Sequence, residues 1–218
     1  MNEVPELLLI DKPSGITSMD VIRVLRKKFD IRKMGHAGTL DPLATGLMLV
    51  GVGPGTKKLT DLIKLDKEYI AEVRIGESRT TGDLEGDVIE SKDASELTEE
   101  GVKIELDSLL GVQRLPVSAY SAIKKDGVPM YKRARQAEKE GEVITEVPVR
   151  DMEVKEVELI DFISGDRAVA TVRFFVGSGT YIRSLGEELG KRLGYPATLQ
   201  NLRRTKVGVY KIEDAVSL

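Results

Sequence analysis

Cysteine is absent from the sequence of 218 residues, histidine occurs once, and no apolar run is long enough for a membrane helix, which needs about 18 to 20 residues. Without cysteine there are no disulfides, no thiolate catalysis and no thiolate-bound zinc. Transition-metal sites usually draw on several histidine or cysteine ligands, so the single His36 argues against one, whereas the many carboxylates leave a magnesium site open. Residues 1–10 lack the basic segment of a signal peptide. We therefore expect a cytoplasmic protein that does not enter a membrane.

The net charge is only −3, but the charged side chains are segregated along the chain. Ten acidic and two basic residues fall within 83–107, whereas seven basic and two acidic residues, a local charge of +5, fall within 114–139. Residues 183–211 also contain seven bases and two acids. This pattern is compatible with a basic, nucleic-acid-binding face on an acidic protein, and equally with solvated surfaces that bind nothing.

Hydrophobic periodicity predicts strands and helices without a regular βαβ alternation. Strands are predicted at residues 6–10, 47–52, 68–76, 147–160 and 168–176, with a last strand near 206–210. Helices are predicted from a cap at Thr17-Ser18 to Phe29, at 56–64, at 95–110, and at 181–193 before Gly194. This order predicts an α+β fold around a central, largely antiparallel sheet flanked by helices and loops.

The sequence contains no repeat, no low-complexity tract and no long linker. A single domain over residues 1–218 is therefore expected. The best candidate for an insertion is the basic segment 117–146, which is broken by the tight-turn signal Asp126-Gly127.

The most unusual segment is GHAGTLDPLATG at residues 35–46. Its glycines permit positive φ or the close approach of another group, and Pro42 disfavours helix at the preceding Asp41. Asp41 is therefore presented from a shaped loop. On these residues alone, an aspartate that caps a backbone N–H of its own turn is the commoner interpretation, and a catalytic carboxylate is the alternative.

This segment resembles the signature loop of the TruB family of pseudouridine synthases, and the resemblance extends over about residues 6–212. Six further motifs resemble those of the family and follow in the same order. They are LLIDKPSG at 8–15, KEY at 67–69, RTTGDLEGD at 79–87, PVSAYSAIK at 116–124, GTYIRSL at 179–185 and LRRT at 202–205.

The resemblance implies an enzyme that isomerises uridine to pseudouridine without redox change, cofactor or metal. It implies Asp41 as the covalent nucleophile and Arg183 as the cation beside it. Tyr69 would stack on the target uracil, although it shares a strand face with Ala71 and Val73 and could instead be a core tyrosine. The catalytic residues implied are therefore Asp41, Tyr69 and Arg183.

The resemblance also implies residues that bind the substrate and its backbone. His36 would fill the space left by the flipped base, Tyr181 and Leu202 would pack around the pocket, and Asp83 would hydrogen-bond in the pocket or to RNA. The basic residues expected to contact the RNA backbone are Lys124, Lys125, Lys132, Arg135, Arg203 and Arg204.

The partner implied is the T-arm stem-loop of tRNA, with the uridine at position 55 as target. A monomer with no membrane contact and no obligate protein partner is expected. Bacterial members of the family usually carry an additional carboxy-terminal domain of the PUA type; here no separate C-terminal RNA-binding domain is expected.

Two alternatives remain open. A guide-dependent relative of the H/ACA type would share most motifs, but its loop generally continues Pro-Lys-Val-Thr-Gly after the aspartate, whereas residues 42–46 read Pro-Leu-Ala-Thr-Gly. A non-catalytic module that binds or folds tRNA would not need Asp41, Tyr69 and Arg183 together.

Overall fold

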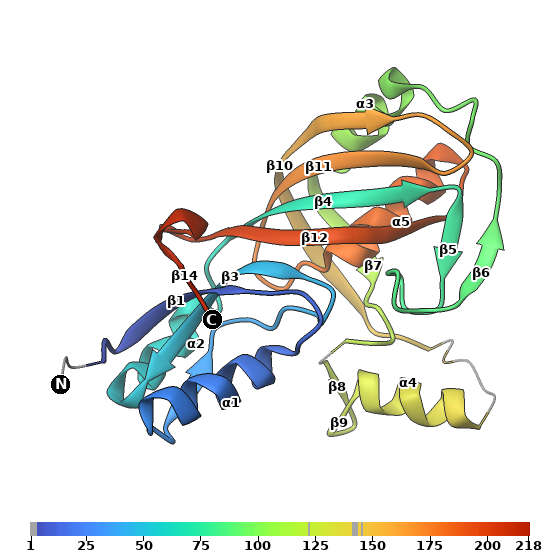
Figure 1. The fold of residues 1–218 in the computed structure, drawn as a ribbon. Helices are drawn as coiled ribbons and strands as arrows, with labels where there is room; N and C mark the ends of the chain where they lie inside the picture. Colours follow the sequence, from blue (N-terminus) through green and yellow to red (C-terminus); the bar gives the residue numbers. More distant parts are fainter. Residues whose placement is uncertain (1–3, 122, 141–143, 145) are drawn as a thin grey trace.

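A computed structural model describes residues 4–121, 123–140, 144 and 146–218. In this part of the chain, one ten-stranded sheet carries the fold, in the order β14-β1-β3-β12-β4-β11-β10-β7, with β2 and β13 paired beside β3 and β12. The neighbours are antiparallel except for β1 with β14 and β3 with β12. The α+β fold around a largely antiparallel sheet, predicted from the sequence, is therefore confirmed (Figure 1).

The strands of this sheet vary widely in length. They are β1 (Leu7–Lys12), β2 (Met34–His36), β3 (Thr45–Val52), β4 (Lys67–Ile75), β7 (Gly111–Pro116), β10 (Val149–Ile163), β11 (Ala168–Val176), β12 (Ala197–Val207), β13 (Tyr210–Lys211) and β14 (Val216–Ser217). Two small hairpins lie outside it. They are β5 (Glu77–Arg79) with β6 (Val88–Ser91), and β8 (Lys124–Lys125) with β9 (Val128–Pro129).

The helices are short. They are α1 (Ser18–Phe29), α2 (Leu59–Leu62), α3 (Glu99–Asp107), α4 (Met130–Lys139) and α5 (Ile182–Leu193), with 3₁₀ turns η1 (Gly53–Lys58) and η2 (Ile212–Asp214). Among the described helices, none is both long and apolar enough to span a membrane.

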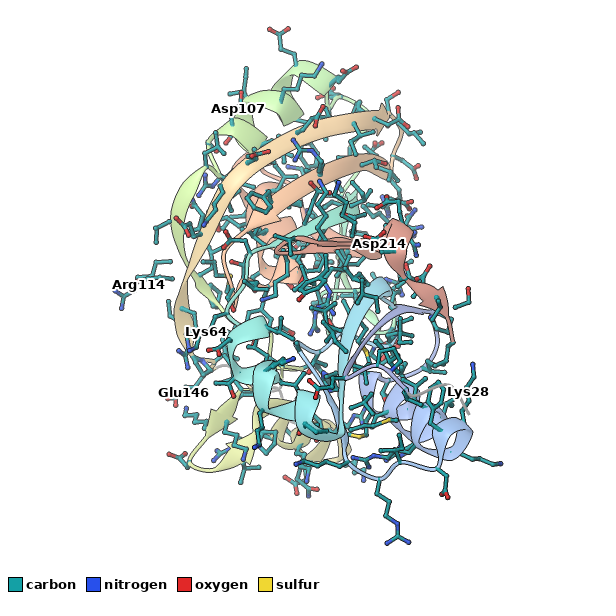
Figure 2. All side chains as sticks on the ribbon, turned by 90° about the vertical axis from the view of Figure 1, so that its left-hand side faces the viewer. Lys28, Lys64, Asp107, Arg114, Glu146 and Asp214 are labelled. Carbon is teal, nitrogen blue, oxygen red and sulfur yellow. The ribbon has the colours of Figure 1, made fainter. Side chains whose placement is uncertain are left out.

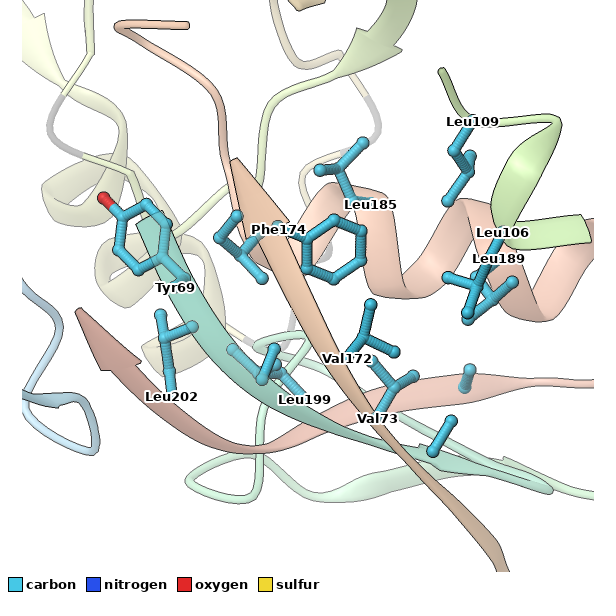
Figure 3. Close-up of a cluster of buried hydrophobic side chains, with 14 of the residues drawn as sticks. Tyr69, Val73, Leu106, Leu109, Val172, Phe174, Leu185, Leu189, Leu199 and Leu202 are labelled. Atoms are coloured by element: carbon cyan, nitrogen blue, oxygen red, sulfur yellow. The ribbon is translucent and has the colours of Figure 1, made fainter. Parts of the chain in front are cut away.

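The largest apolar core lies between the sheet and α5, with α3 beside it. The alternating strand β4 turns Tyr69, Ala71, Val73 and Ile75 to this side, as its period of two predicts. Figure 3 shows the side chains of β4, β11 and β12 facing Leu185 of α5, with Tyr69 at the end of the cluster. The core therefore fixes one end of β4 beside the start of α5.

A separate core joins α1 to β1, β2 and β3. Thr17 begins α1 in a capping box, because its hydroxyl accepts from Asp20 N while the Asp20 carboxylate accepts from Thr17 N. Val21, Ile22 and Leu25 are buried at helical spacing. The predicted start and apolar stripe of this helix are confirmed.

The two parts of the sheet meet where β3 runs parallel to β12, at the register pairs Thr45 with Arg203 and Gly46 with Arg204. Gly46 has a φ of +103° and lies against the Arg204 backbone, where an added Cβ would come within 2.8 Å of the Arg204 nitrogen and closer still to its carbonyl oxygen. Only glycine fits this position without displacing a strand.

We expect Gly46→Ala to lower the free energy of unfolding by at least about 3 kcal/mol, because strain at positive φ adds to a backbone clash. Gly53→Ala is the matched control, since Gly53 also has positive φ, +53°, but meets nothing within 4 Å; its cost should be about 1 kcal/mol. Urea unfolding of both variants measures the difference, and equal losses would refute the close approach.

Several predicted boundaries are wrong. The strand expected near 206–210 is the long β12 followed by the short β13, because bulges between Leu199 and Asn201 and between Arg204 and Lys206 interrupt its alternation. The helix expected at 56–64 is mostly the 3₁₀ turn η1 before a single turn of α2. The helix expected at 95–110 is limited to α3, which Thr98 caps.

The segment predicted as an insertion contains β8, β9 and α4, which lie away from the sheet (Figure 1). Asp126 and Gly127 both have positive φ, as a two-residue hairpin turn requires, so the turn signal is confirmed. Residues 122, 141–143 and 145 of this segment lie outside the described residues. Just before it, the exposed Arg114 projects from the edge strand β7 (Figure 2).

Candidate active site

The loop between β2 and β3 presents Asp41 and is held from behind by buried side chains. The Lys12 ammonium donates to the carbonyl oxygens of Ala44 at 2.6 Å and of Pro42 at 3.2 Å. The Ser18 hydroxyl donates to Leu40 O at 3.0 Å and accepts from Leu40 N at 2.8 Å. The backbone on both sides of Asp41 is therefore fixed by β1 and α1, and its side chain is free to face the other half of the molecule.

Lys12 is fully buried. Burial lowers the pKa of its ammonium to about 8, and the charge of Asp41 opposes this shift. Within the described part of the chain, no carboxylate lies in salt-bridge range of Lys12, so its bonds are to backbone carbonyls.

Arg183, at the start of α5, reaches Asp41 with Nη2 at 3.1 Å from Oδ2. Its other contacts fix the guanidinium: Nη1 donates to Thr81 O at 2.8 Å and to Ser118 Oγ at 3.0 Å, and lies 3.7 Å from Asp83 Oδ2. Nη2 also donates to Tyr120 O at 3.3 Å. The Arg183 guanidinium is thus held between the Asp41 and Asp83 carboxylates and by the loop that contains Ser118. A planar guanidinium can donate in several directions at once, which suits this role.

The environment of Asp41 combines burial with access. Burial raises the pKa of its carboxyl group, the Arg183 charge lowers it, and the charge of Asp83 raises it again. The Asp41 side chain nevertheless keeps 35 % of its surface exposed, whereas that of Arg183 keeps 4 %. An arriving substrate therefore meets the carboxylate, with the cation behind it.

A pocket of about 250 Å³ opens above these two residues, near the lower end of the range for small-molecule sites. Tyr69 and Leu202 come from the neighbouring strands β4 and β12 and lie side by side, with the Tyr69 hydroxyl directed away from the apolar cluster (Figure 3). Tyr181 stands before α5 in the wall of the pocket. Burial and the charge of Asp41 raise the pKa of Tyr181, so its hydroxyl stays protonated.

Comparison of the chain with known proteins identifies its family. The model of the TruB family pseudouridylate synthases (N-terminal domain) matches residues 26–182. The chain belongs to the TruB family. It is 44% identical over 213 residues to the tRNA pseudouridine synthase B of Corynebacterium efficiens, covering 97% of this chain and 70% of that protein. With the enzyme of the same name from Streptomyces avermitilis the identity is 41%, covering 97% of this chain and 71% of that protein.

Solved structures show the same fold. A chain in the crystal structure of a Cbf5-Nop10-Gar1 complex superposes with a TM-score of 0.70 at 26% identity, covering 97% of this chain and 52% of that one. A chain from an H/ACA RNP bound to a substrate RNA gives the same TM-score at 24% identity, covering 97% of this chain and half of that one.

The structure of this TruB-family chain brings to one pocket five of the residues predicted to be catalytic or to bind the substrate base. They are Asp41, Tyr69, Tyr181, Arg183 and Leu202. Asp83 does not line it: it is buried behind Arg183 and accepts from Thr81 Oγ1 at 2.5 Å. His36 ends β2 outside the pocket lining, where burial and the Arg204 charge lower the pKa of its imidazole and favour the neutral ring.

The residues predicted to contact the RNA backbone divide into three groups. Lys124, Lys132 and Arg135 are exposed, while Lys125 pairs with Glu146 at 3.1 Å. Arg203 donates to both oxygens of the Asp11 carboxylate, from Nη2 to Oδ2 at 2.8 Å and from Nη1 to Oδ1 at 3.1 Å. Arg204 is only 1% exposed, because it follows the buried Leu202 by two residues on β12 and strand alternation turns both side chains inward. It also lines the pocket.

Sequence reasoning missed Lys12, Lys67 and Ser118, which hold the loops around the pocket. Lys12 and Lys67 each share a strand face with a buried residue two positions away, Ile10 and Tyr69 respectively, and a buried lysine there needs several acceptors. That placement was a usable signal, whereas nothing local in the sequence marks Ser118 as the partner of Arg183.

Proposed function

We propose that this chain isomerises uridine to pseudouridine in tRNA, at position 55 of the T-arm loop, with Asp41 as a covalent nucleophile. The observation that carries the proposal is the pair formed by the accessible Asp41 carboxylate and the buried Arg183 guanidinium, on the floor of a pocket walled by Tyr69 and Leu202. Membership of the TruB family and the names of its relatives supply the reaction and the substrate class.

The reaction breaks the C1′–N1 bond, turns the uracil and forms a C1′–C5 bond; C5 loses a proton and N1 gains one, so the product is an isomer of the substrate. No electron donor or acceptor is required. Asp41 attacks as a carboxylate, and Arg183 opposes the effect of burial on its ionisation. The Tyr69 hydroxyl, at the mouth of the apolar cluster, would take part in removing the C5 proton.

A uracil within a folded RNA loop must leave its stack to enter this pocket. The ring of Tyr69 and the side chain of Leu202 offer the flat and apolar surfaces that an extruded base packs against. His36 is proposed to stack in the vacated space, for which a neutral ring is suited.

The test is tritium release from tRNA labelled at uracil C5, with a transcript that carries cytidine at position 55 as control. Release from the first transcript but not from the second supports the proposal. Release that needs an added guide RNA would favour the H/ACA-type alternative. Tight tRNA binding without release would leave a binding or folding module.

We also propose that the exposed lysine and arginine side chains of the insertion contact phosphates of the RNA. Lys132→Ala is expected to weaken RNA binding and to reduce the slope of log Kd against log salt by about 0.7 to 0.9, the value for one phosphate contact. Lys103→Ala on α3 is the control, since Lys103 pairs with Glu99 at 2.5 Å in the acidic segment. An unchanged slope of log Kd against log salt for Lys132→Ala would show that Lys132 makes no phosphate contact.

A further inference from the structure

Besides Arg183, two further buried cations line the pocket. Lys67 and Arg204 both line it, with exposed fractions of 6% and 1%. No carboxylate of the described residues lies within salt-bridge distance of either one. The nearby Asp66 is bound instead to the Lys155 ammonium, at 2.8 Å. Buried charges are normally paired, so these two cations are unusual in having no salt-bridge partner among the described residues.

The Arg204 guanidinium is only partly satisfied by the protein. Its Nε donates to Leu47 O at 2.7 Å and its Nη2 to Gly38 O at 3.2 Å. The remaining nitrogen, Nη1, has no acceptor among the described residues and lies beside Gly38, where an added Cβ would be only 3.5 Å away. Two N–H donors of a buried, permanently charged group therefore remain available at the pocket wall.

Lys67 supplies charge and shape at the same place. Its Nζ donates to Ile63 O at 2.5 Å, to Leu65 O at 2.6 Å and to Ser178 Oγ at 3.4 Å. These bonds join the turn after α2 to the Gly177–Thr180 loop, which also lines the pocket. Burial, and then the charge of Arg204, lower the pKa of Lys67 to about 8, while the charge of Asp66 opposes this shift.

A third polar group in this wall also lacks a partner. Thr180 Oγ1 is buried without a hydrogen bond to any described residue, and Thr180 lines the same pocket. An unsatisfied buried hydroxyl destabilises the fold, and an arriving oxygen acceptor would remove that cost.

We propose that Arg204, Lys67 and Thr180 form a phosphate subsite that holds a phosphate flanking the target uridine once the nucleotide has flipped into the pocket. The proposal rests on the proposed function, because it takes the RNA as substrate. Uracil is neutral and offers no counter-charge to two cations, whereas each linkage of RNA carries one negative charge. Lys67 precedes Tyr69 by two residues, about 6.6 Å along the strand, the scale on which a nucleotide separates its base from its phosphate.

The direct test changes the RNA. T-arm stem-loops are made with a neutral methylphosphonate at the linkage 5′ of the target uridine, at the linkage 3′ of it, or two nucleotides away. For the unaltered protein, Kd is expected to rise about tenfold for one of the two flanking linkages, the loss of one charge-assisted contact. The distant substitution should have a smaller effect. No loss at either flanking linkage would overturn the subsite.

Protein variants assign the contact. In Lys67→Met, the same flanking methylphosphonate should raise Kd less than threefold relative to the natural linkage. Lys206→Met is the control, because Lys206 lies two residues after Arg204 on β12 but pairs with Glu68 at 2.9 Å; it should retain the full tenfold effect. An equal effect in the unaltered protein and in Lys67→Met would place the phosphate elsewhere, and thermal melts of each variant verify folding.

Two further measurements separate the possibilities. Inorganic phosphate, titrated at constant ionic strength without RNA, should bind only weakly; saturation at micromolar concentration would assign the subsite to a free anion. Because the main readout is binding, tritium release is measured independently. A protein that shows the linkage effect but no release would lose the proposed function and keep the subsite.

Discussion

Asp41→Asn is expected to lower turnover on tRNA by at least about 10⁴-fold, because removal of a covalent nucleophile leaves only binding and positioning to accelerate the reaction. RNA affinity should change little, because the amide has the size of the carboxylate and the basic residues of the insertion are unchanged. Single-turnover tritium release together with filter binding measures both quantities on the same preparation.

The stability of this variant provides an internal check. Burial raises the pKa of Asp41, so the folded state disfavours its charged form and ionisation at neutral pH destabilises the fold. Asp41→Asn should therefore melt at a temperature equal to or above that of the unaltered protein, which excludes misfolding as the cause of inactivity. Asp61→Asn, at a side chain that is 85 % exposed, is the control that should retain full activity. Turnover by Asp41→Asn above one per cent of that of the unaltered protein would show that Asp41 is not the nucleophile.

Arg183→Lys should reduce kcat by about 10² to 10³-fold. Lysine retains the charge but cannot contact Asp41 while also donating to Thr81 O and Ser118 Oγ, as the arginine fork does. Arg192→Lys, at the other end of α5, is the matched control. Arg192 donates to Glu188 and Ser108, so its substitution should affect stability more than turnover.

The pH dependence distinguishes a role in ionising Asp41 from a purely structural role. Activity requires the carboxylate, so the rate falls as pH drops through the Asp41 pKa. The Arg183 charge lowers that pKa against the effect of burial, and Arg183→Met removes the charge. The acidic limb of the pH–rate profile should therefore move to higher pH in Arg183→Met. An unmoved limb with reduced kcat would assign Arg183 to positioning alone.

Much of the fold was predictable because its elements carry strong local signals. The cap at Thr17, the alternation of β4 and the turn at Asp126-Gly127 each have a physical cause within a few residues. Strand β12 was largely missed, since its two bulges break the period on which strand prediction depends. The two signals differ in how far along the chain they act. Alternation is set by neighbouring residues, whereas a bulge depends on the pairing of β12 with another strand.

For the pocket, motif resemblance indicated residue identities and the structure supplied their orientation. Asp41, Arg183 and Leu202 lie far apart in the sequence, and no pattern of spacing shows that they meet. Arg204 illustrates the limit, because adjacent arginines at 203 and 204 look alike in sequence but face different surroundings. One forks Asp11, and the other is buried under the Asp41 loop.

The short parallel contact between β3 and β12 has a consequence for how the molecule loses activity. Strand β3, which follows the Asp41 loop, packs with α1 in one apolar core, whereas Tyr69 and Leu202 belong to another. Leu40 and Ala44, on either side of Asp41, reach across the junction and pack in the core of Tyr69 and Leu202. Regions of a protein open with different free energies, and this seam is paired at only two register positions. A fluctuation that parts the seam would draw the Asp41 loop away from Tyr69 and Leu202 and separate nucleophile from cation, so catalysis would report on the junction between the two parts of the sheet.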